Sequence, residues 1–348
     1  MLRVGFDASP LTLPHPLGIR RVVAETLAAL EARGAIEVVR LAPDRGRGTR
    51  AWRQRVLPRE VRGRDLAGIH SFVSAFPVLG PGRRVQTIHE LPWRHGVREN
   101  ADLRHRLWAR LGPRRADAVV TATETTAREI GVRRAGEGGR LHVVPWGVSP
   151  FFAPEPAPGT VDEPLLDRYR LTEEPFVLAA GAVRAKKDLA ALLQGVARLA
   201  SDGRPVPKVV VTGEHTADLR RDLGLAQRLG LARFVSTPGE VPEEDLPGLL
   251  RLASAACLLS RSEGFGLPVL EAMACGTPVV VPRQSAQAEV AGPEAFAVDA
   301  HDPASVAGGV AAAIERREAL RFVLPGRARE FPWSRTAEGI EELWKGFA

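Results

Sequence analysis

The chain alternates short apolar runs with helical stretches, and it does so in two blocks separated by a proline-rich segment. Six candidate strands fall in the first block, at 2–9, 36–42, 69–74, 84–91, 116–123 and 141–147. Helical patterns lie between them at 22–34, 101–112 and 124–132. Apolar strands that alternate with helices predict a parallel sheet covered on both faces.

The pattern breaks at FFAPEPAPGTVDEP, which begins at Phe151 and suits neither periodicity, and then restarts. Strands are expected at 175–183, 207–214, 232–239, 255–260, 277–282 and 295–300. Helices are expected at 189–201, from about Ala217, near Leu246 and at the amphipathic tail 332–348.

The sequence therefore predicts an α/β protein of two doubly wound parallel-sheet Rossmann-like domains that face each other across a cleft. The expected boundaries are 1–152 for the first domain, 153–172 for a linker, 173–328 for the second domain, and 329–348 for a helix that returns to the first. In open α/β sheets, ligands bind beyond the carboxyl ends of the strands.

The net charge of +7 is unevenly distributed. Residues 1–150 carry 26 arginines and no lysine against 14 acidic residues, a net charge of +12, whereas the rest of the chain carries −5. Arg45–Arg64 alone holds eight arginines. This stretch predicts peripheral contact with an anionic membrane or an anionic acceptor, and a solvated arginine-rich loop is the alternative. Aromatic residues are only 5% of the chain, which argues against a stacking surface for nucleic acid.

Cysteine content and hydropathy indicate the compartment. The two cysteines, Cys257 and Cys275, lie in apolar stretches, which favours buried free thiols and a reducing cytoplasm. No apolar run is long enough to cross a bilayer, and the N-terminus reads as a strand instead of a signal peptide. No Cys/His spacing suggests a metal site. We expect a cytoplasmic protein with peripheral contact at the inner membrane face.

The segment RSEGFGLPVLEAMACGTPVVVP, from Arg261, carries the most specific chemistry. Gly266 permits a tight turn, and Pro268 suits the first turn of a helix because its missing N–H needs no partner there. Phe265, Gly266 and Leu267 would then present N–H groups at a helix N-terminus, which is a site for an anion.

Two glutamates flank this turn. Glu271, about one helical turn inside, could accept hydrogen bonds from ribose hydroxyls, as an acid does in dinucleotide folds. Glu263, on the loop before the turn, could contact the sugar at the other end of a diphosphate. The spacing suits a nucleotide-sugar.

The order E-G-F-G-L-P-V-L-E followed by A-M-A-C-G-T-P-V-V resembles the signature of retaining glycosyltransferase family 4, also called glycosyl transferases group 1. The resemblance covers nearly the whole chain, and it is greatest over 175–302 and least over 45–70. It implies the GT-B fold and a metal-independent hexosyltransferase. No cofactor is implied, because the nucleotide-sugar is a substrate.

The segment GAVRAKKDLAALLQGVARL resembles the phosphate-binding segment of that family. Lys187 falls on the family's lysine and Lys186 on its arginine, and these cations would neutralise the leaving diphosphate. Ala182 stands where many relatives carry a second arginine, for which Arg184 would compensate.

Two stretches of the first block also resemble the family. TIHELPW resembles its His-Asp pair facing the donor sugar, with His89 at a strand's carboxyl end and Glu90 in the Asp position. SPLTLPHPLGIRRVV resembles the N-terminal loop that closes over the donor. Gly18 matches there, and Arg20 replaces a second glycine.

The resemblance thus implies catalytic roles for His89, Glu263 and Lys187, and donor binding by Gly18, Arg184, Lys186, Lys187, Phe265, Gly266, Leu267 and Glu271. It implies sugar transfer with retention to a glycan or lipid-linked acceptor, with GDP-mannose preferred to UDP- or ADP-sugars as the donor, as in mannosyltransferase-like relatives.

Two alternatives remain at this point. Arg20, Ala182 and Trp146, which replaces an Asn in the family's hinge, motivate a catalytically impaired relative that binds a nucleotide-sugar or a partner enzyme. An NAD-dependent enzyme on a similar sheet is disfavoured, because DASPLTLP follows the first strand where a Gly-x-Gly-x-x-Gly would stand.

Overall fold

The computed structural model describes residues 1–43, 49–99, 103–134, 136, 139–171, 174–181 and 183–347. The chain divides into two compact units. Unit 1 comprises 1–147 and 331–348, and unit 2 comprises 148–330. Sequence analysis placed the corresponding boundaries at 152, 173 and 329.

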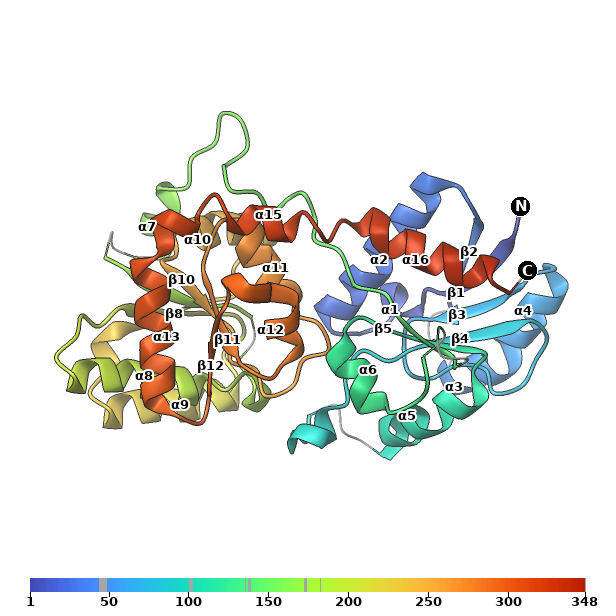
Figure 1. Cartoon of the computed structure of the whole chain (residues 1–348), viewed down its shortest axis with the longest axis horizontal. Coiled ribbons are helices and arrows are strands. Elements are labelled where there is room, and N and C mark those ends of the chain that lie inside the picture. Colours follow the sequence, from blue (N-terminus) through green and yellow to red (C-terminus); the bar gives the residue numbers. More distant parts are fainter. Residues whose placement is uncertain are drawn as a thin grey trace. The chain divides into compact units, whose positions relative to one another are not determined.

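Unit 1 is built on a six-stranded parallel sheet in the order β2-β1-β3-β4-β5-β6 (Figure 1). All six predicted strands are present. They are β1 (Arg3–Asp7), β2 (Glu37–Leu41), β3 (Gly68–Ser71), β4 (Arg83–Thr87), β5 (Ala118–Thr121) and β6 (Leu141–Val143).

Helices cover both faces of this sheet (Figure 1). They are α1 (Ser9–Thr12), α2 (Leu17–Arg33), α3 (Thr49–Ala51), α4 (Leu57–Gly63), α5 (Leu103–Arg115), α6 (Glu124–Ile130) and α16 (Trp333–Lys345), with a π-helix η1 at Trp52–Val56 and a 3-10 helix η2 at Pro92–His95. Helices α2 and α16 pack together on one face, and α4, α5 and α6 lie on the other.

Helical structure from 49 to 63 was not predicted. The buried apolar residues there are Trp52, Leu57 and Val61, so five positions separate the first two. A π turn adds one residue to the ordinary helical repeat, which explains why a period of 3.6 did not reveal the helix.

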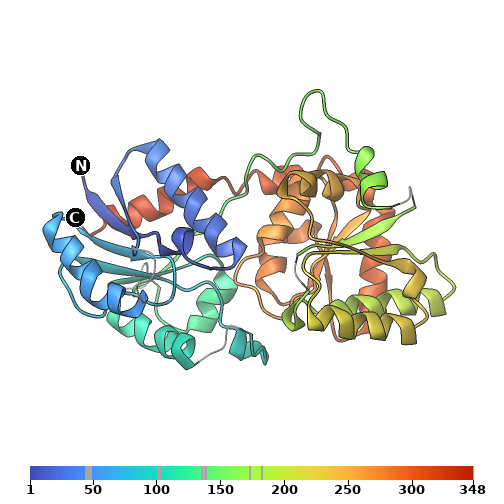
Figure 2. The same cartoon turned by 180° about the vertical axis from the view of Figure 1, so that it is seen from behind.

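Unit 2 carries a second six-stranded parallel sheet, in the order β12-β11-β10-β7-β8-β9. Figure 2 shows helices on both faces of this sheet. Its strands are β7 (Phe176–Ala179), β8 (Lys208–Thr212), β9 (Val235–Gly239), β10 (Ala255–Cys257), β11 (Val279–Pro282) and β12 (Phe296–Val298). Each lies in a predicted strand range.

The helices of unit 2 are α7 (Pro164–Arg168), α8 (Leu189–Ser201), α9 (Ala217–Arg228), α10 (Leu246–Leu252), α11 (Leu267–Ala274), α12 (Ala286–Ala291), α13 (Pro303–Glu315), α14 (Arg317–Leu320) and α15 (Leu324–Ala328). Helix α8 has the predicted bounds. It packs against α13 at Gly195, where an added Cβ would lie 2.4 Å from Val306 Cγ1, so the absence of a side chain lets the two helices approach closely.

The segment predicted as a linker is fixed to unit 2. Asp162 accepts two hydrogen bonds from Arg251, at 2.6 and 2.7 Å, and Arg168 pairs with Asp245 at 2.7 Å. These contacts make residues 153–171 part of the unit instead of a free connection.

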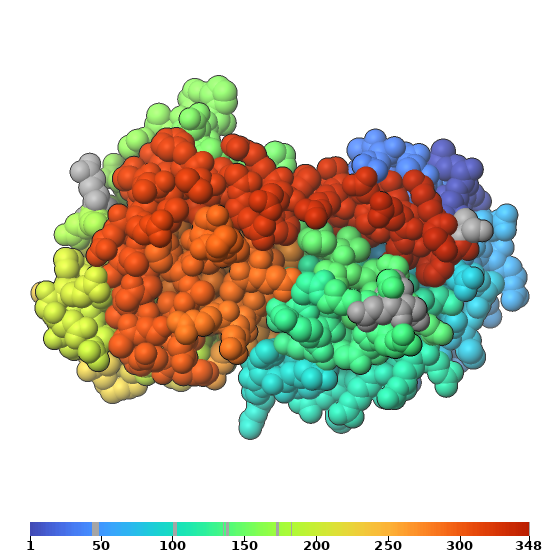
Figure 3. Space-filling view, in the orientation of Figure 1, coloured from blue at the N-terminus to red at the C-terminus, as the bar shows by residue number. Residues whose placement is uncertain are grey.

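The C-terminal helix belongs to unit 1, as expected. Arg33 Nε donates to Glu341 Oε1 at 3.0 Å, and Thr336 Oγ1 donates to the carbonyl of Pro145 at 2.7 Å. Figure 3 shows the last residues, in dark red, on the surface beside segments from earlier in the chain. Within the described residues, no helix is long and apolar enough to cross a bilayer.

Candidate functional site

The strand order of unit 2 reverses between β7 and β10, which are neighbours in the sheet although 75 residues lie between them in the chain. Such a reversal point opens a crevice at the carboxyl ends of the two strands. The chain leaves β7 toward Gly181–Asp188 and leaves β10 toward Ser260–Leu267. The two segments on which sequence analysis relied therefore meet at one edge of the sheet.

Hydrogen bonds from backbone N–H groups hold the segment after β7. It forms a 3-10 helix at Ala185–Lys187, in which the Lys187 N–H donates to the Arg184 carbonyl at 2.8 Å. The Ala185 N–H donates to Asp218 Oδ2 at 2.8 Å. Asp188 then adopts a left-handed conformation, with φ of 51°, and α8 begins. These bonds fix the direction in which both lysines leave the backbone.

Both lysines meet Glu263. Lys187 Nζ lies 2.8 Å from Glu263 Oε1, and Lys186 Nζ lies 3.9 Å from the same oxygen. The side chains are partly exposed: 12% for Lys186, 28% for Lys187 and 18% for Glu263. Three of the predicted site residues thus form one charged cluster that solvent can reach.

The charge state of this cluster follows from its surroundings. Burial alone would raise the pKa of Glu263, but the charges of Lys187 and Lys186, with hydrogen bonds from Lys187 and Ser260, outweigh it and lower the pKa below its ordinary value. Glu263 is therefore a carboxylate at neutral pH, and the cluster keeps an excess of positive charge.

A second ion pair ties the two strand-end segments together. Arg261 donates to both carboxylate oxygens of Asp188, at 2.6 and 3.3 Å, and the Arg261 N–H donates to the Lys186 carbonyl at 2.8 Å. Sequence analysis gave neither Arg261 nor Asp188 a role. Their residue types carry no signal by themselves, because the pair exists only once the two strands are adjacent.

The predicted helix N-terminus is present next to this cluster. Helix α11 follows Gly266, whose φ of 114° is a conformation that favours glycine, and Pro268 is its second residue. Phe265 is 5% exposed and Glu271 is 6% exposed. Amides at a helix N-terminus and partly exposed cations such as Lys186 and Lys187 are groups of the kind that suits a diphosphate.

His89 lies in unit 1, two residues beyond the end of β4. Its Nε2 is 2.7 Å from the Phe72 carbonyl, so this nitrogen carries the proton that is donated. Burial lowers the pKa of His89 to about 4, and the hydrogen bond to Phe72 opposes this only in part. The ring is a neutral imidazole at pH 7, with its centroid 5.7 Å from that of Trp146, which is buried.

The remaining predicted residues have mixed environments. Gly18 is the second residue of α2, so the expected N-terminal loop is helical from Leu17 onward. An added Cβ on Gly18 would meet no atom within 4 Å. Arg184 is exposed just before the 3-10 helix of Lys187, and Ala182 lies outside the described residues.

Unit 1 also contains a charged pair at the end of its first strand, which sequence analysis missed. Arg53 Nε donates to Asp7 Oδ2 at 2.8 Å and its Nη2 donates to Ser9 Oγ at 2.7 Å, while the Ser9 N–H donates to Asp7 Oδ1 at 3.0 Å. The side chains of Arg53 and Asp7 are 8% and 0% exposed.

The arginines of the Arg45–Arg64 stretch differ in exposure, so the stretch is not uniformly solvated. Arg53 is buried and pairs with Asp7 in the interior of unit 1. Five other arginines of the stretch are exposed, at positions 50, 55, 59, 62 and 64. Arg45 and Arg47 lie outside the described residues.

Residues 166–324 match the family described as "Glycosyl transferases group 1". This part of the chain is similar to the members of that family. The region holds Lys186, Lys187, Glu263 and Glu271, whereas His89 and Gly18 lie outside it. The resemblance stated from the sequence is thereby confirmed.

Curated glycosyltransferases are also similar to this chain. A D-inositol 3-phosphate glycosyltransferase of Xylanimonas cellulosilytica is 31% identical over 237 residues, which is 66% of this chain and 57% of the relative. The O-antigen chain mannosyltransferase B of Escherichia coli is 29% identical over 174 residues, 49% of this chain and 45% of the relative. The chain spans about half the length of the curated relatives that it matches.

Solved structures show the same fold along the whole chain. The Anabaena HepE structure in complex with UDP-glucose aligns with a TM-score of 0.75 and 16% identity, and the alignment covers 99% of this chain and 100% of that one. The sucrose-phosphate synthase structure from Thermosynechococcus elongatus aligns with a TM-score of 0.74 and 19% identity, covering 99% of each chain. The predicted GT-B fold class is confirmed.

Proposed function

We propose that this protein is a retaining glycosyltransferase that moves a sugar from a nucleotide diphosphate donor to a hydroxyl of a glycan or lipid-linked acceptor. The observation that carries the proposal is the cluster of Lys186, Lys187 and Glu263 beside the N-terminus of α11, inside the glycosyl transferases group 1 region. Cations and helix amides at one sheet edge are suited to stabilise a leaving diphosphate.

The lysines supply the charge on which departure depends. As the bond between the anomeric carbon and the phosphate oxygen breaks, negative charge grows on that oxygen. The backbone that carries Lys186 and Lys187 is held by hydrogen bonds before the reaction, and Lys187 exchanges its contact with Glu263 for the phosphate oxygen. The metal-independent reaction expected from the resemblance rests on this pair.

Retention follows in this proposal from attack on the face that the diphosphate leaves. The acceptor oxygen bonds to the anomeric carbon, and the acceptor proton passes to the departing phosphate oxygen. Glu263 then orients the sugar through hydrogen bonds and forms no covalent intermediate, in contrast to the two-carboxylate scheme of retaining glycosidases. His89, as a neutral imidazole, is proposed to hydrogen-bond a sugar hydroxyl.

GDP-mannose is the donor that we propose first, because mannosyltransferases are among the relatives. The Anabaena structure with UDP-glucose makes UDP-glucose the competing choice. Thermal unfolding with each of GDP-mannose, UDP-glucose and ADP-glucose separates them, since a ligand raises stability in proportion to the logarithm of its concentration over Kd.

Sugar transfer then tests the activity itself. The donor that raises the unfolding temperature should be consumed with release of its nucleoside diphosphate, and a chelator should leave the rate unchanged. A donor that binds without transfer or hydrolysis would establish the catalytically impaired relative instead.

Peripheral attachment to the inner membrane face of the cytoplasm is also part of the proposed function.

A further inference from the structure

Helix α5 exposes a row of leucines. Leu103, Leu107 and Leu111 are 83%, 54% and 39% exposed, and their spacing of four residues places them on one side of the helix. Exposed leucines are ordinary when they are scattered. Three in a row on one helix form a continuous apolar strip, which we call the leucine strip.

Arginines border the leucine strip on both sides. At 100° per residue, Arg104 and Arg115 fall on one flank and Arg106 and Arg110 on the other, with Arg114 near the end of the strip. All five are exposed, and α5 contains no acidic residue. An apolar centre between cationic flanks is the pattern of a helix that lies in a membrane interface.

The opposite side of α5 is anchored to the sheet, so the strip has a fixed direction. An added Cβ on Gly112 would lie 1.9 Å from Gln86 Oε1, and Gln86 Nε2 donates to the Trp108 carbonyl at 3.1 Å. The Trp108 ring meets Phe76 edge-on, with 5.5 Å between centroids. Rotation of the helix to bury its leucines would break these contacts.

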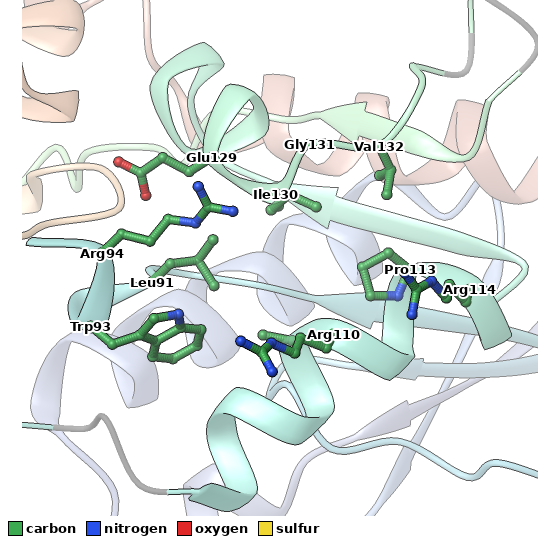
Figure 4. A pocket seen from close by; sticks show the side chains of 11 residues that line it. Leu91, Trp93, Arg94, Arg110, Pro113, Arg114, Glu129, Ile130, Gly131 and Val132 are labelled. Atoms are coloured by element: carbon green, nitrogen blue, oxygen red, sulfur yellow. The ribbon is translucent and has the colours of Figure 1, made fainter.

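A pocket of about 630 Å³ borders the same helix, between α5 and α6. In Figure 4, Arg94 from the 3-10 helix after β4 and Arg110 from α5 lie on either side of Leu91. Arg114 also lines the pocket, as does Glu129, which bonds His95 at 2.7 Å. Three cations beside an apolar floor suit a phosphate that carries a hydrocarbon.

We propose that α5 docks unit 1 on a bilayer of anionic phospholipid, with the leucine strip at the acyl boundary and the arginines at the phosphates. One headgroup enters the pocket that Arg94, Arg110 and Arg114 line. The docking surface is thus α5, and not the Arg45–Arg64 stretch on which peripheral contact was first predicted. The single sign of charge on α5 favours a lipid surface over a protein partner, whose interface would have to neutralise five arginines.

Vesicle co-sedimentation tests the proposal with the full chain. Wild-type protein should bind vesicles of phosphatidylcholine with phosphatidylglycerol and should not bind vesicles of phosphatidylcholine alone. The triple variant L103Q/L107Q/L111Q should bind the anionic vesicles about tenfold or more weakly, because the apolar part of the contact is lost. Its thermal unfolding should match that of wild type, since the replaced side chains face solvent.

Matched variants distinguish the effect of the α5 surface from the effect of removing exposed apolar residues or arginines elsewhere in the chain. The control L79Q/V161Q removes apolar residues that are 74% and 67% exposed elsewhere, and it should bind as wild type does. R110Q/R114Q should weaken binding and reduce its dependence on salt. R55Q/R59Q, in the other arginine-rich stretch, should change binding less than R110Q/R114Q.

Depth of insertion gives a second readout. Both natural cysteines are buried, so a thiol introduced by Leu107→Cys can be labelled selectively with an environment-sensitive fluorophore. The label should shift to the blue on anionic vesicles. Unchanged binding by the triple leucine variant, a greater loss in R55Q/R59Q than in R110Q/R114Q, or a label that stays in water would each overturn the proposal.

Discussion

The two units place a charged pair at the same point of two related sheets, but they bury it to different depths. In unit 1 the strand order reverses between β1 and β3, and in unit 2 between β7 and β10. Asp7 and Arg53 at the first reversal are 0% and 8% exposed, whereas Glu263 and Lys187 at the second are 18% and 28% exposed. The buried Asp7–Arg53 pair can contribute only to the stability of unit 1, whereas a partly exposed lysine such as Lys187 can leave its carboxylate and bind an anion from solvent.

The sheets also differ in when the chain turns back. In unit 1, one strand, β2, is placed on one side of β1 before the chain crosses to the other side, which is the flavodoxin-like order. In unit 2, two strands, β8 and β9, are placed on one side of β7 before the chain crosses, which is the dinucleotide-binding order. Both orders open a crevice at the carboxyl ends of the strands where the order reverses, so the burial of the charged pair is what distinguishes the two units. Four experiments test this contrast, from the largest expected effect to the smallest.

Arg53→Met should cost about 3–5 kcal/mol of unfolding free energy, because it leaves the Asp7 carboxylate buried without its cation. Urea denaturation measures the change. The exposed neighbour provides the control, since Arg55→Met should stay within about 0.5 kcal/mol of wild type. D7N/R53M should regain much of the loss. Equal stability of the two single variants would show that the buried pair is not structural.

Lys187→Ala should lower turnover about 100- to 1000-fold, the usual loss when one group that stabilises transition-state charge is removed. Its unfolding curve should stay close to that of wild type, because the Lys187–Glu263 pair is partly exposed and screened by solvent. Lys187→Arg should restore part of the rate, and Lys208→Ala, at the start of β8, should leave it unchanged. Full activity in Lys187→Ala would remove this lysine from the mechanism.

Acid should destabilise unit 1 before unit 2. Burial lowers the pKa of His70 to about 3, whereas a histidine in an unfolded chain titrates near 6.5. Above pH 6.5, His70 is neutral in both the folded and the unfolded state, so its burial costs no stability. As the pH falls, the unfolded state binds the proton first, so about 2 kcal/mol is lost between pH 6.5 and 5. The histidines of unit 2, His215 and His301, are both exposed.

Hydrogen exchange at pH 5 measures this difference as an earlier loss of protection in the strands of unit 1. His70→Gln should flatten the pH dependence of unfolding over that range, and His301→Gln should follow the wild-type curve. Simultaneous loss of protection in both sheets would contradict the assignment of acid sensitivity to unit 1.

Gly266→Ala should cost about 1–3 kcal/mol, because a side chain at φ of 114° is strained and its Cβ would lie 3.2 Å from Gln287 Cγ. Gly308→Ala should change the free energy of unfolding in the opposite direction. An added Cβ there meets no atom within 4 Å inside α13, so stability should rise by about 0.5–1 kcal/mol. Chemical denaturation of both variants measures the pair, and equal effects would show that the turn before α11 tolerates a side chain.

The sequence was informative wherever the structure depends on neighbours in the chain. The twelve strands were visible as apolar runs, and α8 was predicted at Leu189–Ser201 without error. The turn into α11 was readable as well, because Gly266 and Pro268 have backbone requirements that few conformations meet. The helix at 49–63 was not readable, since its π turn disrupts the period on which such predictions depend.

The sequence by itself determined the alternation of strands and helices, the similarity of residues 166–324 to glycosyl transferases group 1 and the position of the α11 N-terminus, because each is encoded in local sequence patterns. Only the tertiary structure decided that Lys187 meets Glu263 across 76 positions, and that Arg53 is buried while Arg55 is exposed. Those outcomes depend on which strands become neighbours and on which helix side faces a sheet. Both are settled by the packing of the whole unit and not by any local pattern.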